Sequence, residues 1–263
     1  MYRWYLIAAT LFAIIASVRG MLAVHHGRRS RSTVMWMVAA LGCQIAFLSI
    51  RGQLRGICPL ADFGEILVFL SWSLTLFYLL VGPVYRISLL GVFTAPVVVV
   101  FQLIALLPGV LQFNPQHIDG GNAWHEMHSA TAVLAYGAFA LAAVAGVMFL
   151  VLDRQLKERH LQSGLFRNLP PVRELLVSLE RLLWLGCGLL TVGVVAGFLM
   201  PHGNDVGGYA RLSGHLHLLT ALIVWAGYAG LLAVKVVRGL TGRRLSLLVV
   251  GMFFFSLVVF AFV

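Results

Sequence analysis

The chain has 263 residues, of which 60% are apolar and 11% are charged. Soluble globular domains carry about 25% charged and about 45–50% apolar residues, so this composition excludes a disordered tail, a coiled coil and an ordinary water-soluble enzyme. The formal net charge of +10, from 19 Lys and Arg against 9 Asp and Glu, would indicate nucleic-acid binding in a soluble protein, but in a membrane protein it first indicates topology.

Eight long apolar runs predict eight transmembrane helices. A helix needs about 20 residues to cross the hydrocarbon core of a bilayer, and the bilayer offers no water to an extended backbone, so each run is expected to be helical. In chain order the runs cover about residues 2–24, 33–50, 65–82, 89–108, 125–152, 182–200, 215–234 and 245–263. The sequence therefore predicts an all-α polytopic membrane helix bundle, with a single integral membrane domain over residues 1–263.

Lys and Arg concentrate in alternate connections between these runs. The connections on this basic side carry Arg28, Arg29, Arg31, Arg86, Arg154, Lys157, Arg159, Arg167, Arg173, Arg181, Lys235, Arg238, Arg243 and Arg244. Because basic residues favour the cytoplasmic side of a membrane, this side is predicted to be cytoplasmic and both termini to face outward. We expect a multi-pass protein of the bacterial inner (cytoplasmic) membrane, with its termini in the periplasm. Membrane lipid is expected to surround it, and nucleic acid is not an expected partner.

The longest cytoplasmic connection, about residues 153–181, ends in a predicted amphipathic helix over about 170–181. Two prolines at 170 and 171 suit the first turn of a helix. Leucines follow at near-helical spacing, a pattern typical of a helix that lies at the membrane interface. This segment is expected to lead into the sixth span.

Six of the nine histidines fall on the predicted outer side, around three helix ends. They are His117, His125, His128, His202, His215 and His217. His125 and His128 are three residues apart and share a helical face, whereas His215 and His217 are about 200° apart, so at most one of them can point into the bundle. Imidazole is the commonest metal ligand and an axial ligand of haem iron. The cluster therefore predicts a site for haem, zinc or copper, or a proton relay.

Other side chains on the same side complete a candidate site. Arg55 and Arg211 could pair with carboxylates of a ligand through charge-assisted hydrogen bonds. Trp124 and Tyr136 offer flat apolar surface, although Trp124 could equally anchor its helix at the membrane interface. Glu65 begins the third run, where a carboxylate either stabilises the helix N-terminus or has a functional role. The candidate cofactor-binding residues are His125, His128, His202, His215, His217, Arg55, Arg211, Trp124 and Tyr136.

Motifs along the chain carry a family resemblance. The fifth run has His128, with Tyr136 eight residues later and an Asp-Arg-Gln-Leu-Lys exit at 153–157. A Cys-Pro-Leu sequence at 58–60 precedes the third run, which continues through a Glu and a Ser-Trp pair. Over about residues 55–250 the chain resembles the CcsA/CcmC-type cytochrome c assembly family, in particular its short, eight-helix branch of the YpjD and HemX type.

The resemblance implies a protein that binds or presents haem at the outer membrane face during c-type cytochrome assembly. His128 corresponds to an outward-facing haem-ligand histidine of that family. His217, His215 or His202 would then be the second axial ligand. Haem is the expected cofactor, and haem-biogenesis or cytochrome c assembly proteins are the expected partners. No covalent step needs a catalytic residue, so we expect the protein not to be an enzyme.

Two other functions fit the same residues. The outer histidines could form a zinc or copper site or transport pathway, and the tryptophan-rich outer segment of haem-ligating family members has no counterpart at residues 204–209. Alternatively, the protein could be a regulatory membrane scaffold that binds a partner through the basic loop at 153–181. Metal and haem analysis of the purified protein would separate these hypotheses.

Overall fold

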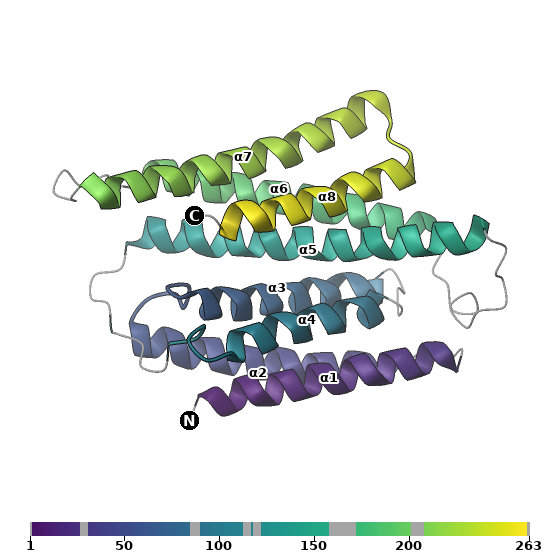
Figure 1. Cartoon of the computed structure of the whole chain (residues 1–263), viewed down its shortest axis with the longest axis horizontal. Helices are drawn as coiled ribbons and strands as arrows, with labels where there is room; N and C mark the ends of the chain where they lie inside the picture. Colours follow the sequence, from purple (N-terminus) through teal and green to yellow (C-terminus); the bar gives the residue numbers. More distant parts are fainter. Residues whose placement is uncertain are drawn as a thin grey trace.

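A computed structural model describes residues 2–26, 31–84, 90–112, 117, 122–157, 172–200 and 208–261. Over these residues it contains eight helices and no strand (Figure 1). The helices are α1 (Arg3–His25), α2 (Arg31–Arg55), α3 (Phe63–Val84), α4 (Leu90–Leu106), α5 (Ala123–Lys157), α6 (Val172–Leu199), α7 (Gly208–Arg238) and α8 (Gly242–Ala261). In this described part, seven helices are long and apolar enough to cross a membrane, and α4 is a shorter apolar helix. The predicted all-α membrane bundle is confirmed.

Several helices extend beyond the apolar runs that predicted them. The second helix continues from the predicted end at 50 to Arg55, and the sixth joins the run that begins at 182 to the predicted amphipathic segment, so that it begins at Val172. Apolar runs mark the part of a helix that suits lipid, whereas the backbone stays helical through polar residues whose side chains find partners. At the end of α5, for example, Lys157 Nζ lies 2.7 Å from Asp153 Oδ2, an i, i+4 pair that supports the last turn.

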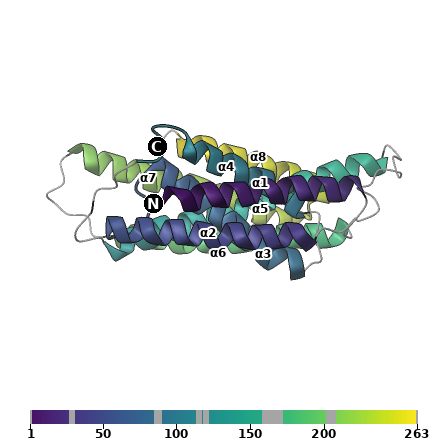
Figure 2. The ribbon, with the colours of Figure 1, turned by 90° about the horizontal axis from the view of Figure 1, so that it is seen from below.

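The helices form two groups of four, which Figure 1 shows one above the other. In one group α1 packs on α2 and α4, and α3 packs on α2 and α4; in the other, α6 packs on α5 and α7, and α8 packs on α5 and α7. The two groups meet where α3 and α4 contact α5. Figure 2 shows α1 and α2 side by side along one face. Because successive helices alternate in direction, α1, α3, α5 and α7 all begin at one end of the bundle, which we call the N-terminal end.

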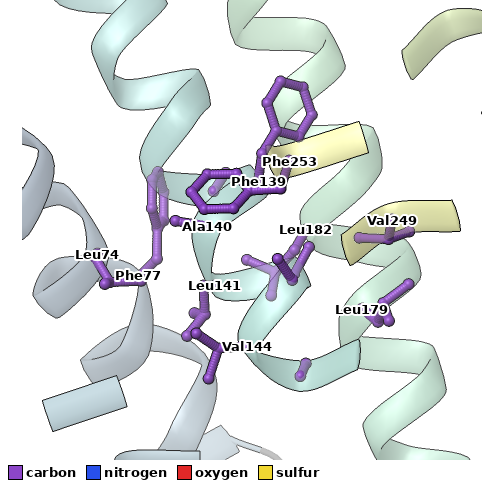
Figure 3. Packing of buried hydrophobic residues seen from close by; sticks show 14 of the residues in the cluster. Leu74, Phe77, Phe139, Ala140, Leu141, Val144, Leu179, Leu182, Val249 and Phe253 are labelled. Carbon is purple, nitrogen blue, oxygen red and sulfur yellow. The ribbon is translucent and has the colours of Figure 1, made fainter. Parts of the chain in front are cut away.

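The fifth helix is the centre of the larger apolar core. Figure 3 shows Phe139 and Leu141 of α5 between side chains of α3, α6 and α8. The ring of Phe139 stacks on Tyr228 of α7, with ring centroids 3.6 Å apart and planes 4° from parallel. A Cβ on Gly137 would lie 2.0 Å from Oγ of Ser73. Glycine at this position therefore permits the close approach of α5 to α3.

The predicted amphipathic segment is part of α6 from Val172 onward. Its exposed face carries Arg173, and its buried leucines, Leu175 and Leu179, belong to the α5-centred core. The segment therefore continues into the sixth helix without a break and packs its leucine face on protein. At the same end of the bundle, Lys235 of α7 pairs with Glu180 of α6.

Candidate functional site

The first turn of α5 lies at the N-terminal end of the bundle and carries two of the predicted site residues. Asn122 precedes the helix, and its side-chain Oδ1 accepts a hydrogen bond from the backbone N–H of Trp124 at 3.0 Å. This is an N-cap, which satisfies one of the free amides at a helix start. The acidic Glu126 in the same turn complements the helix dipole. Trp124 and His125 are exposed.

His128 is half-buried one turn further along α5, and a backbone group of α6 holds its ring. Nδ1 of His128 lies 2.6 Å from the carbonyl oxygen of Gly193. A carbonyl oxygen only accepts hydrogen bonds, so Nδ1 must carry the proton that is donated. In the neutral imidazole, Nε2 then holds the lone pair. Metal-ligating histidines have this same arrangement, with one ring nitrogen bonded to a carbonyl or carboxylate and the other free to bind metal.

Gly193 is the residue that makes this contact possible. A Cβ there would lie 2.9 Å from Oγ1 of Thr131 and 3.4 Å from the backbone oxygen of His128. The absence of a side chain therefore lets α6 approach α5 at the level of the histidine. Sequence reasoning gave no role to Gly193, and its distance of 65 positions from His128 left no local signal to find it.

Tyr136 lies eight residues after His128, about 12 Å further along the helix. It is half-buried and packs against both apolar clusters, the α5-centred one and a second cluster formed around α2 and α3. The structure therefore places Tyr136 deeper between the two helix groups than His128, and places Trp124 at the surface of the N-terminal end.

The remaining predicted ligands come from the connection before α7 and its first turns. His202 lies outside the described residues, and so do the side chains of Arg211, His215 and His217. The backbone at 211, 215 and 217 belongs to α7, which packs against α6. Among the side chains that the structure does describe, no three His, Cys, Asp or Glu residues gather as a metal site. The assignment of the second ligand stays a prediction.

Arg55, also predicted as a ligand partner, belongs to a buried ion cluster at the N-terminal end. The cluster joins two arginines of α2 to two carboxylates at the start of α3. Nε of Arg51 and Nε of Arg55 both donate to Oε1 of Glu65 at 2.7 Å. Their Nη2 atoms donate to Oδ2 of Asp62 at 2.9 and 3.0 Å. The side chains of Arg51 and Glu65 have no exposed surface, so the two charges of each sign compensate one another away from solvent.

The two carboxylates of the cluster also cap α3. Oδ1 of Asp62 accepts the backbone N–H of Glu65 at 2.7 Å, and Oε2 of Glu65 accepts the backbone N–H of Ala61 at 3.0 Å. The bond to Asp62 is the one that an N-cap side chain makes in a capping box, whereas Glu65 reaches the amide of Ala61, one residue before the N-cap. These contacts support the reading of Glu65 as a residue that stabilises the helix start, because one carboxylate oxygen accepts a backbone N–H there and the other binds the arginines. This cluster was not predicted from the sequence; the Asp-x-x-Glu spacing at 62–65 and the i, i+4 spacing of the arginines are the signals that could have indicated it.

Further contacts tie the cluster to the ends of α1 and α4. Nη1 of Arg51 donates to the hydroxyl of Tyr2 at 3.2 Å and to the backbone oxygen of Gln112 at 2.9 Å. The guanidinium of Arg51 thus reaches three chain segments besides its own. His117 lies close by, with Nδ1 3.1 Å from the carbonyl oxygen of Leu54.

Cys58 connects this cluster to the start of α5. Burial, together with the negative charges of Glu126 and Glu65, raises the pKa of its thiol to about 11. The influence of Glu126 shows that the first turn of α5 lies near the connection between α2 and α3. The ion cluster and His128 therefore share the N-terminal end of the bundle.

Comparison with known proteins identifies the family. The sequence pattern of the family described as cytochrome C assembly protein matches residues 60–263, which include α3 to α8. The chain belongs to this family. His128 and the two carboxylates of the ion cluster fall within the matched residues, whereas its two arginines precede them.

Curated relatives agree with this membership. The cytochrome c biogenesis protein CcsA of Synechococcus elongatus is 27% identical, over 81% of this chain and 78% of that protein. The protein of the same name from Microcystis aeruginosa is 26% identical, over 78% of this chain and 76% of its own length. That of Mesostigma viride is 24% identical, over 89% of this chain and 84% of its own length. The similarity therefore extends over most of the length of both proteins in each pair.

Proposed function

We propose that this protein handles haem during c-type cytochrome assembly, with His128 as one axial ligand of the haem iron. Family membership supports the role in cytochrome assembly. The observation that supports haem is the hydrogen bond from Nδ1 of His128 to the Gly193 carbonyl, because it orients the ring and leaves Nε2 to bind iron.

The second axial ligand is an imidazole at the start of α7, from His217, His215 or the preceding His202. Trp124 and Tyr136 supply apolar and aromatic surface for the porphyrin, with His125 at its edge. Arg211 pairs with the propionates, since Arg55 already donates Nε and Nη2 to Glu65 and Asp62. The protein lies in the bacterial inner membrane, with the N-terminal end of the bundle facing the periplasm.

Binding and presenting haem requires no covalent step by a side chain, and we propose that the protein itself is not an enzyme. Its partners are then proteins that supply haem or that accept it during cytochrome assembly. The bundle provides an axial imidazole, an apolar surface and a cation for the propionates, which together hold haem without altering it.

A visible absorption spectrum tests the proposal. Protein purified from haem-replete cells should show a Soret band, and His128→Ala should lose most of it. His26→Ala is a matched control. Nδ1 of His26 also lies 2.7 Å from a backbone carbonyl oxygen, that of Leu22, but His26 follows the last turn of α1, at the other end of the bundle from His128. It should leave the band unchanged. Absence of haem from the purified protein, together with no uptake of added hemin, would overturn the proposal.

The same samples distinguish a transition-metal site. A histidine with one nitrogen held by a carbonyl suits zinc or copper as well as iron. Stoichiometric zinc or copper without porphyrin, lost in His128→Ala, would replace haem as the ligand while leaving the site in the same place.

A further inference from the structure

Four of the buried polar side chains inside the first helix group come one from each of its helices. Gln44 of α2, Ser71 of α3 and Gln102 of α4 have no exposed surface, and Thr10 of α1 is 3% exposed. They lie in the α1–α4 group, away from the contact between His128 and α6. Polar groups in an apolar interior need hydrogen-bond partners, because unpaired ones are costly to bury.

The packing of α1 against α4 sets Thr10 and Gln102 at the same level. A Cβ on Gly20 would lie 3.2 Å from Cγ2 of Val92, which fixes these two positions opposite each other. The helices run in opposite directions, so a step of ten residues back along α1 and ten residues forward along α4 leads to Thr10 and Gln102. Both steps cover the same length of about 15 Å.

The packing of α3 brings Ser71 and Gln44 to this level as well. Gly91 of α4 contacts the ring of Tyr78, and Gln102 follows eleven residues, or about three turns, later on the same helical face. Gln102 therefore faces α3. It lies opposite a position of α3 that is eleven residues before Tyr78, and this position is about one turn from Ser71. Nε2 of Gln44 donates to Oγ of Ser71 at 3.4 Å. We call Thr10, Gln44, Ser71 and Gln102 the glutamine layer.

The amides of this layer have hydrogen-bonding capacity that the described part of the chain does not use. Oε1 of Gln44 and both Oε1 and Nε2 of Gln102 are buried without a partner there, as is Nε1 of Trp72, next to Ser71. Two of these atoms are carbonyl oxygens, which need donors. The hydroxyls of Thr10 and Ser71 donate to backbone oxygens of their own helices, Leu6 and Val68, and so do not supply them.

We infer that the glutamine layer is an internal hydration site, in which bound water donates hydrogen bonds to Oε1 of Gln44 and of Gln102. Water fits because it donates two hydrogen bonds and accepts two, and so serves both the amide oxygens and the amide nitrogen. The ligand is neutral because the layer carries no charged side chain. The site belongs to the α1–α4 group and is independent of haem binding at His128.

Radiolytic labelling in H2(18)O tests this inference on the full-length protein in lipid nanodiscs. Hydroxyl radicals formed from bound water oxidise adjacent side chains, so Trp72 should incorporate 18O several-fold faster than Met148, which is fully buried in the α5-centred core. Labelling of Trp72 should fall several-fold in the double variant Gln44→Leu/Gln102→Leu. Equal labelling of Trp72 and Met148 in the wild-type protein would overturn the inference, whether or not the variants fold.

Thermal unfolding of the two single variants and the double variant provides the second measurement. With water bridging the amides, each single variant lowers Tm and the double variant is no worse than the more damaging single one, because the two side chains share one ligand. A rise in Tm for Gln102→Leu would reveal a dry, unpaired amide and overturn the inference. Non-additive Tm values without 18O labelling of Trp72 would indicate a direct amide pair and overturn it equally.

Discussion

Arg51 donates from Nε to Oε1 of Glu65 at 2.7 Å, and neither side chain has exposed surface. This contact joins the last turn of α2 to the first turn of α3. It lies at the centre of the ion cluster that holds the N-terminal end of the first helix group together. Both charges are away from solvent, so each one would be strongly destabilising without the opposite charge beside it. The stability of this end of the bundle therefore depends on the pair.

Removing Arg51 is therefore expected to destabilise the protein strongly. Arg51→Met leaves the Asp62 and Glu65 carboxylates with one guanidinium, and breaking a buried pair in this way costs about 3–5 kcal/mol. The free energy of unfolding in mixed micelles measures the effect. Lys157→Met is the control, because its pair with Asp153 is largely exposed and should contribute no more than about 1 kcal/mol. Equal effects of the two substitutions would contradict the role given to the cluster.

The contact between Gly193 and His128 predicts a steric effect on ligand binding. In Gly193→Ala the new methyl group would lie 2.9 Å from Oγ1 of Thr131, so α6 must move away from α5 and lengthen the hydrogen bond to Nδ1. The haem content of purified protein should fall several-fold, and Thr131→Ala in the same chain should restore part of it. Gly188→Ala is the matched control on α6, since its added Cβ would meet nothing within 4 Å. Equal haem loss in both variants would argue against this contact.

The Cys58 thiol predicts a pH dependence of alkylation. Its pKa is raised to about 11 by burial and by the charges of Glu126 and Glu65. Because the thiolate is the reactive form, the labelling rate in the folded protein should rise about tenfold per pH unit up to about pH 11. The thiol ionises at lower pH in the unfolded chain, so this group favours folding below pH 9 and that contribution is lost as pH rises toward 11.

Glu126→Gln should move the alkylation profile of Cys58 to lower pH, because it removes a negative charge that opposes ionisation. Mass spectrometry of the peptide that contains Cys58 separates its labelling from that of Cys43 and Cys187. Glu174→Gln, in the first turn of α6, is the control and should leave the profile unchanged. A profile that is the same in all three proteins would show that Glu126 does not act on this thiol.

The N-cap of α5 predicts a smaller change in stability. Asn122→Ala removes the acceptor for the Trp124 amide and should lower the free energy of unfolding by about 1 kcal/mol. Asn122→Asp keeps an acceptor and adds a favourable charge at the helix start, so it should retain the stability of the parent. A loss of the same size in both variants would show that the cap is not what stabilises this turn.

The number and order of the helices could be predicted from the sequence because bilayer thickness imposes a length on each apolar run. This is a local property, readable from about 20 consecutive residues. Histidines near the helix ends were equally visible, and they directed attention to the start of α5. The end of α2 was misplaced because hydropathy does not detect polar helical turns whose side chains are paired.

Only the tertiary structure could decide how the helices are rotated and paired. Nothing near His128 in the chain indicates that a carbonyl 65 positions away holds its ring. Arg55 looked like a free cation until α3 placed Glu65 and Asp62 beside it. Gln44 and Gln102 are isolated polar residues in two apolar runs, and packing brings them to the same level. Such contacts depend on the register between helices, which arises from side-chain packing across the bundle and has no local signature in the sequence.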